Sequence, residues 1–308
     1  MLHVVHHPDY VAPPAPDGRF TFDKYARVMG ALDEALVAYE IHTPARMPRH
    51  WIEAVHDPAY VAEVLACAVP REKERRIGFP VTPHNVGRAQ LAPGGTWLAA
   101  HLALRHGYAA NAAGGSHHAL HDTGAGYCVF NDLAIAANRL VAEGSVRRIL
   151  VVDCDVHQGD GTAALMAGRA DVVTFSIHAE KNFPVRKAAS DCDVALADGT
   201  VDDAYLSALA AHLPSLIDSV TPDLILYQAG VDPHRDDRLG RLALSDAGLE
   251  ARDRFVVRQS LSRGVAVASA LGGGYGADGW AVARRHAASI LACADEAARC
   301  GNGRAFSA

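Results

Sequence analysis

The chain has 308 residues, of which 50% are hydrophobic and 21% are charged, and its formal net charge is −6. This is the composition of a globular protein, and its scattered Lys and Arg residues and short apolar runs argue against nucleic-acid binding and against a membrane span or a polybasic membrane patch. Because the amino-terminal segment lacks the features of a signal peptide and the six cysteines form no CxxC pair, we expect free thiols and a cytoplasmic location.

Short apolar runs alternate with longer helical patterns along the chain. Runs typical of buried strands occupy residues 2–5, 108–113, 148–153, 171–177, 223–229 and 264–270. Helical patterns occupy residues 95–106, 131–144, 202–220, 245–264 and 279–300. This alternation predicts an α/β fold with a mainly parallel sheet and helices on both faces. In the absence of a linker or a break in composition, we expect one domain over residues 1–308, with a frayed tail at 301–308.

A polar or glycine-rich turn follows five of the six predicted strands. In chain order these turns are "GGSHHA" from Gly114, "DCDVHQGDGT" from Asp153, "SIHAEKNFP" from Ser176, "AGVDPHRDDRLG" from Ala229 and "LGGGYG" from Leu271. Ligands of parallel sheets bind outside the carboxyl ends of the strands. We therefore expect the five turns to form one site at one edge of the sheet.

Two carboxylates and a histidine in these turns have the character of metal ligands. Asp155 and His157 are two residues apart after one strand, so their side chains are expected to point to the same side. Asp232 follows another strand and is the third candidate, although an Asp before Pro233 is also a common turn former. Two carboxylates, one imidazole and an open coordination position suit a catalytic zinc ion or Fe²⁺.

Other turn residues are suited to proton transfer and to charge stabilisation. His117 and His118 follow two glycines, which allow the backbone to approach another element closely. A catalytic imidazole needs a carboxylate on its far nitrogen to fix its tautomer, and Asp153 and Asp160 are of the right type. The hydroxyl of Tyr275, which follows three glycines, could donate to an oxyanion. The alternative is that Tyr275 is incidental to a glycine-rich turn.

The sequence blocks resemble those of the zinc-dependent histone deacetylase superfamily, which has the arginase–deacetylase fold. "GGSHHA", "DCDVHQGDGT", "QAGVDPHRDDRLGRLALS" and "LGGGYG" occur in the family's order, and segments 54–65 and 87–104 are similar to its amino-terminal part. The resemblance runs from about residue 2 to residue 295. Gln158 and the long block after strand 223–229 look closest to the class IV branch and its bacterial relatives.

The resemblance implies a role for each of these residues. The implied zinc ligands are Asp155, His157 and Asp232. The implied acid–base pair is His117 and His118, backed by Asp153 and Asp160 respectively, with Tyr275 as the oxyanion donor. The implied substrate channel contains Gly126, Tyr127, Phe183 and Gly273, and the family usually has Phe where this chain has Tyr127. A structural potassium site is implied at Asp153, Asp155, Ser176 and the carbonyls of His157 and Ile177.

The implied reaction is removal of an acyl group, either acetyl or long-chain, from lysine in a protein or peptide, or from a small amine such as a polyamine. Class IV likeness and the small Ser116 predict that long chains are removed at least as efficiently as acetyl. A binuclear manganese ureohydrolase shares the fold but needs carboxylates two residues after His157 and Asp232, where this chain has Gly159 and His234. A non-catalytic binding protein is expected to have lost one of the site residues, and none is missing. The protein could also form an oligomer.

Overall fold

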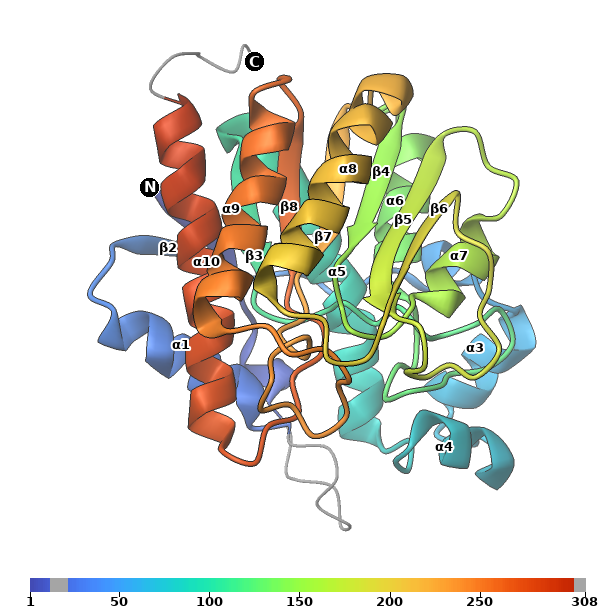
Figure 1. Cartoon of the computed structure of the whole chain (residues 1–308). Coiled ribbons are helices and arrows are strands. Elements are labelled where there is room, and N and C mark those ends of the chain that lie inside the picture. The colour runs from blue at the N-terminus through green and yellow to red at the C-terminus, as the bar shows by residue number, and fades with distance from the viewer. Residues whose placement is uncertain (12–21, 302–308) are drawn as a thin grey trace.

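A single eight-stranded sheet organises the chain in a computed structural model that describes residues 1–11 and 22–301 (Figure 1). The strands are β1 (Leu2–Val5), β2 (Tyr39–His42), β3 (Tyr108–Asn111), β4 (Ile149–Asp153), β5 (Val172–Ala179), β6 (Cys192–Leu196), β7 (Leu224–Gln228) and β8 (Ala266–Ala270). They lie in the order β2-β1-β3-β8-β7-β4-β5-β6, and all pairings between them are parallel. The predicted α/β fold is confirmed. Residues 302–308, which belong to the predicted tail, lie outside the described residues.

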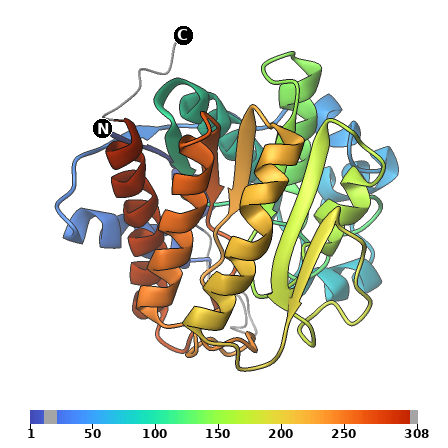
Figure 2. The ribbon, with the colours of Figure 1, turned by 45° about the horizontal axis from the view of Figure 1, so that its top comes forward.

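Helices cover both faces of this sheet. The helices are η1 (Pro8–Tyr10), α1 (Lys24–Glu34), α2 (Arg49–Glu53), α3 (Pro58–Leu65), α4 (Arg71–Ile77), α5 (Pro83–His106), α6 (Asp132–Ala142), α7 (Asp160–Met166), α8 (Asp202–Val220), α9 (Asp246–Leu261) and α10 (Gly279–Gly301). The helices α8, α9 and α10 pack side by side on one face (Figure 2), with α1 against α10, while α5 and α6 pack together on the other. Among the described residues, no helix is both long and apolar enough to cross a bilayer.

The sequence patterns do not predict two of the strands and several of the helices. Strands β2 and β6 lie at the two edges of the sheet, and all but one of their residues are exposed or only partly buried, so neither forms an apolar run. Helix α5 begins twelve residues before the predicted start at 95, and Thr82 caps its first turn. The helix continues through Pro93, a residue type that usually ends a helix. Helices α1 to α4 and α7 were not predicted, and all except α1 have eight residues or fewer.

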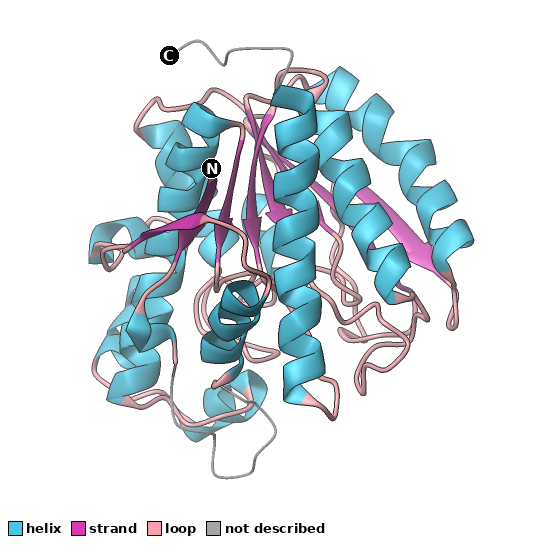
Figure 3. Ribbon diagram, turned by 90° about the vertical axis from the view of Figure 1, so that its left-hand side faces the viewer, coloured by secondary structure: helices cyan, strands magenta, loops and turns pink. Residues whose placement is uncertain are grey.

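The six predicted strands form the inner part of the sheet, and this placement fixes the position of the turns that follow them. Every residue of β1, β3, β4, β7 and β8 is buried. Because all strands run in the same direction, their carboxyl ends lie at one edge, where the loops gather below the arrowheads in Figure 3.

Candidate active site

The five predicted turns follow five strands that are neighbours in the sheet, β3, β8, β7, β4 and β5. Their polar side chains meet in a largely buried cluster rather than on the open surface. His117, Asp155, His157 and Asp232 each expose 7% or less of their surface. Burial of so many ionisable groups is costly unless they pair with one another or bind a metal.

The side chains of Asp155, His157 and Asp232 converge on one point. Their ligand atoms all lie within 4.8 Å of one another. The Nδ1 atom of His157 is 2.9 Å from Oδ1 of Asp155 and 3.2 Å from Oδ2 of Asp232. That Oδ2 atom is buried and accepts no hydrogen bond, whereas Oδ1 of Asp232 accepts one from the amide of Val156 (2.9 Å). A buried carboxylate oxygen without a donor, beside a second carboxylate and an imidazole, fits a divalent metal ion.

The charges at this point depend on one another. Burial disfavours the charged imidazolium of His157, but the carboxylates of Asp155 and Asp232 outweigh it and raise its pKa to about 10. Burial and the nearby Asp155 raise the pKa of Asp232. Burial also opposes ionisation of Asp155, yet His117 and His157 hold its pKa well below the usual range. A positive charge at the centre of the cluster therefore stabilises its carboxylates, and either a proton or a metal ion can supply that charge.

Two residues outside the predicted set hold these ligands in place. Gln228, at the end of β7, donates from Nε2 to Oδ2 of Asp155 (2.8 Å), and its Oε1 accepts from the amide of Gly230 (2.8 Å). Arg252 of α9, which is fully buried, donates to the carbonyl oxygens of Cys154 (3.1 Å) and Gly230 (2.7 Å). The only sequence signal for Gln228 is a polar residue inside the apolar run "LILYQA".

The two adjacent histidines each face a carboxylate. His117 Nδ1 is 2.7 Å from Oδ2 of Asp153, and His118 Nδ1 is 2.6 Å from Oδ1 of Asp160. Burial opposes the charge on His117, but Asp153 and Asp155 raise its pKa to about 9. Burial and the neighbouring His117 lower the pKa of His118 to about 4. In each pair the carboxylate fixes Nδ1, so Nε2 is the nitrogen left to exchange a proton with a bound molecule.

The predicted channel residues lie beside this cluster: Gly126, Tyr127 and Gly273 line a cavity that reaches Asp155, and Phe183 contacts His118. The Tyr127 and Tyr275 rings lie with their centroids 5.7 Å apart, and the Phe183 and His118 rings are nearly perpendicular with their centroids 4.8 Å apart. Gly126 leaves room for that pair, because a Cβ there would lie 2.5 Å from Cδ2 of His118. Burial and the carboxylates of Asp155 and Asp232 raise the pKa of Tyr275 well above its usual value, so its hydroxyl stays protonated.

Gly273 lies against the candidate metal ligands Asp155 and Asp232. Its amide donates to Oδ2 of Asp155 (2.8 Å), and a Cβ at this position would overlap Oδ2 of Asp232. The position two residues after His157 is equally constrained, since a Cβ on Gly159 would overlap Oδ2 of Asp153. A carboxylate that bridges a second metal cannot be built there without displacing Asp153.

His234, two residues after Asp232, faces away from the cluster. Its Nδ1 atom is 3.6 Å from Asp236 and its Nε2 atom is 3.4 Å from Asp246. It therefore does not supply a ligand for a second metal beside Asp232.

The residues of the implied potassium site are close in the sheet. Ser176 of β5 pairs in register with Asp153 of β4, and its hydroxyl lies 3.0 Å from Nδ1 of His178. The amide of Asp155 donates to Oδ1 of Asp153 (3.1 Å). Ile177 is buried and pairs with Val194 of β6.

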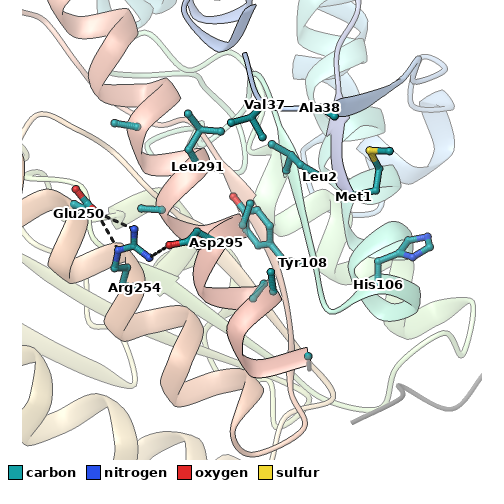
Figure 4. Close-up of a pocket in the computed structure, with 16 residues that line it drawn as sticks. Met1, Leu2, Val37, Ala38, His106, Tyr108, Glu250, Arg254, Leu291 and Asp295 are labelled. Atoms are coloured by element: carbon teal, nitrogen blue, oxygen red, sulfur yellow. Dashed lines mark hydrogen bonds and ion pairs between the residues drawn. The ribbon is translucent and has the colours of Figure 1, made fainter. Parts of the chain in front are cut away.

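A small cavity adjoins this cluster, and a much larger one lies away from it. The inner one, of about 30 Å³, is lined by Lys24, Arg88, His117 and Tyr275, among others, and reaches Asp155. The other, of about 850 Å³, lies between the second half of α10 and the first residues of β1 and β3 (Figure 4). It is therefore at the amino ends of these strands, and it contains none of the predicted site residues.

Comparisons with known proteins give a consistent result. The chain matches the histone deacetylase domain over residues 19–291. An uncharacterized protein of Picosynechococcus sp. is 46% identical over 274 residues, which are 88% of this chain and 91% of that protein. Histone deacetylase 2 of Arabidopsis thaliana is 31% identical over 59% of this chain, and the histone deacetylase-like amidohydrolase of Pseudomonas aeruginosa is 31% identical over 58%. These two matches span only 48% and 50% of the relatives' own lengths.

Solved structures share the fold at lower sequence identity. The acetylpolyamine aminohydrolase from Burkholderia pseudomallei aligns with a TM-score of 0.77 and 21% identity, over 94% of this chain and 98% of that one. The HD domain of HDA15 aligns with a TM-score of 0.78 and 20% identity, over 99% of this chain and 92% of that one.

Proposed function

This chain belongs to the histone deacetylase family, and from that premise we propose that it removes an acyl group from an amine by metal-assisted hydrolysis of the amide bond. The observation that carries the proposal is the convergence of Asp155, His157 and Asp232 on one point. It is supported by the two histidine–carboxylate pairs beside that point. Zinc, or Fe²⁺ in its place, fits this donor set, and when bound it supplies the Lewis acidity that polarises a carbonyl and acidifies water.

The two histidines move the protons of the reaction. Nε2 of His117 lies 3.8 Å from Oδ1 of Asp155, so it faces the metal ligands, while Asp153 holds Nδ1 on the other side of the ring. Hydrolysis adds the oxygen of water to the carbonyl carbon, breaks the carbon–nitrogen bond and transfers a proton to the leaving amine. One imidazole accepts the proton of the water and the other delivers a proton to the amine, and the carboxylates keep both rings oriented.

Tyr275 acts on the oxygen of the carbonyl. This oxygen gains negative charge as the water adds, and a protonated phenol hydroxyl at hydrogen-bond distance stabilises that charge more than the neutral ground state. The aromatic rings of Tyr127 and Phe183 and the small Gly126 shape an approach that suits a slender, extended amine such as a lysine side chain.

The inner cavity favours an acetyl group over a long acyl chain. Its volume of about 30 Å³ leaves room for a small group only. Lys24, which lines it, is buried and donates to the carbonyl of Gly272 (2.9 Å), so part of the lining is a charged side chain rather than an apolar one. This volume argues against the expectation from Ser116 that long chains are removed at least as efficiently as acetyl, because a long chain requires Lys24 and Arg88 to move.

We also propose that this chain is similar to the class IV branch of the family. This similarity rests on Gln158, whose Nε2 donates to the carbonyl of Ala188 (2.8 Å) and to Asp193 (2.8 Å). Gln158 thereby ties the loop of the metal ligands to the segment between β5 and β6. The potassium site at Asp153 and Ser176 is likewise proposed on the residues present.

The substrate class is tested by comparing kcat/KM for an acetyl-lysine peptide, a dodecanoyl-lysine peptide and an acetylated polyamine. Asp232→Asn serves as the inactive control. We expect the acetyl-lysine peptide to be hydrolysed fastest. Preference for the dodecanoyl peptide would contradict the argument from the inner cavity. Preference for the acetylated polyamine would show that the substrate is a small amine and not a lysine side chain. If the metal-loaded protein hydrolysed none of the three substrates, the proposed function would be wrong.

A further inference from the structure

A second group of metal-binding side chains lies at the free edge of the sheet. His3 of β1 and Glu40 and His42 of β2 bring one imidazole nitrogen each and one carboxylate within 4.8 Å of one another. Strand β2 is the edge strand, and five strand-to-strand steps separate it from β4, which leads into Asp155. At about 4.8 Å per step, β2 and β4 are about 24 Å apart across the sheet.

The pairing of β1 with β2 brings these residues together. His3 pairs in register with Glu40, and His42 is two residues further along β2. Since successive side chains of a strand point to opposite faces, Glu40 and His42 lie on the same face. Three side chains with nitrogen and oxygen donors therefore converge on one face of a two-strand unit.

The distances between the donor atoms match those around a single tetrahedral ion. His3 Nδ1 is 3.0 Å from His42 Nε2 and 3.5 Å from the Glu40 carboxylate, and His42 Nε2 is 3.8 Å from that carboxylate. Ligands at bond lengths near 2.0–2.1 Å in tetrahedral geometry are about 3.3 Å apart. The distance to Glu40 is 3.5 Å at its Oε2 atom for His3 and 3.8 Å at its Oε1 atom for His42. The three separations bracket the tetrahedral value, so small movements of Glu40 and His42 would bring both nitrogens and one carboxylate oxygen into range.

The site combines a fixed ligand with two that remain accessible. His3 is 7% exposed, and the ring of His106, at the end of α5, stacks on it with 4.0 Å between centroids. The side chains of His42 and Glu40 are 21% and 58% exposed, which leaves a path for an ion and a position for water.

We propose that His3, Glu40 and His42 form a second metal site, the edge site, which binds a divalent transition-metal ion of the zinc type. Two imidazoles and one carboxylate are ligands that zinc prefers. The ion would fasten β2 to β1 in addition to their backbone hydrogen bonds. The edge site stabilises the sheet and takes no part in hydrolysis, since none of its three residues lines the cavity that reaches Asp155.

The test is a zinc titration of the full chain, with the bound ions counted by competition with a chromogenic chelator. We expect the wild-type protein to bind two zinc ions per chain. His42→Gln and Glu40→Gln replace accessible side chains at the edge, so both variants should fold. We expect each substitution to lower the affinity for the second zinc ion at least tenfold. His212→Gln, which changes an exposed histidine on α8, is the matched control and should retain both ions.

Two readouts separate the edge site from the hydrolytic one. The second zinc equivalent should raise the melting temperature of the wild-type protein and not that of His42→Gln, because an ion that binds only the folded state stabilises it. The kcat of His42→Gln should equal that of the wild type. A wild-type protein that stops at one ion, or a His42→Gln variant that keeps the second ion at wild-type affinity, would overturn the proposal and leave His3 and His42 as a hydrogen-bonded pair.

Discussion

Replacing Tyr275 by Phe isolates the contribution of a single hydroxyl group to hydrolysis. The Tyr275 ring lies 5.7 Å from that of Tyr127 and 6.4 Å from that of His157, measured between centroids, and Phe keeps both contacts. The variant should therefore keep its fold and its metal. Loss of one oxyanion donor typically lowers kcat by about a hundredfold to a thousandfold, which corresponds to about 2.7–4 kcal/mol of transition-state stabilisation. We expect a loss of this size at an almost unchanged KM.

The assay measures kcat and KM on an acetyl-lysine peptide, with zinc content and melting temperature recorded for each variant. Tyr127→Phe is the matched control, because it removes a hydroxyl from the neighbouring ring and should leave kcat near the wild-type value. If Tyr275→Phe turns over at the wild-type rate, Tyr275 is a turn residue and the oxyanion needs another donor. An equal loss in both variants would instead point to the polarity of the channel.

Three further predictions concern the support of the site and the stability of the fold. Gln228→Leu removes the amide that donates to Asp155, and we expect zinc affinity, measured by chelator competition, to fall about 10- to 100-fold; unchanged affinity would mean that Gln228 does not position this ligand. Gly273→Ala places a methyl group against Asp232, so the purified variant should lack the catalytic zinc while its circular dichroism remains that of the wild type. Burial lowers the pKa of His56 to about 4, so below pH 6.5 the unfolded chain takes up a proton that the folded chain does not. The free energy of unfolding should therefore fall by about 1.4 kcal/mol per pH unit between pH 6.5 and 4 from this group alone. Urea unfolding should show a smaller slope for His56→Gln, and an equal slope would contradict the assignment.

The sequence patterns identify the inner strands because a strand that is buried on both faces has an apolar sequence. Strands β4, β7 and β8 are wholly buried and appear as continuous apolar runs. The turns after them carry the polar residues of the site, since the end of a parallel strand is where a ligand can be reached. Strands β2 and β6 have no such apolar sequence, because an edge strand with partly exposed residues resembles a loop.

What the patterns miss depends on contacts between distant segments. Gln228 is hidden in an apolar run, and only the pairing of β7 with β4 brings it to Asp155. The size of the inner cavity depends on Lys24 and Arg88, from α1 and α5. Lys24 lies in no recognised motif, and the resemblance of segment 87–104 gives Arg88 no role. The edge site could not be predicted without β2, because His3 and Glu40 are 37 positions apart and meet only through strand pairing.

The proposed hydrolysis at a single metal ion is tested most directly by adding zinc stepwise to metal-free protein while the release of acetate from an acetyl-lysine peptide is measured. The His42→Gln variant is used, so that an ion at the edge site is not counted. We predict that activity is absent without metal, rises in proportion to added zinc and stops rising at one ion per chain, while Asp232→Asn in the same background stays inactive. Activity that survives complete removal of metal, or that reaches its maximum only at two ions per chain, would contradict a single catalytic ion at Asp155, His157 and Asp232.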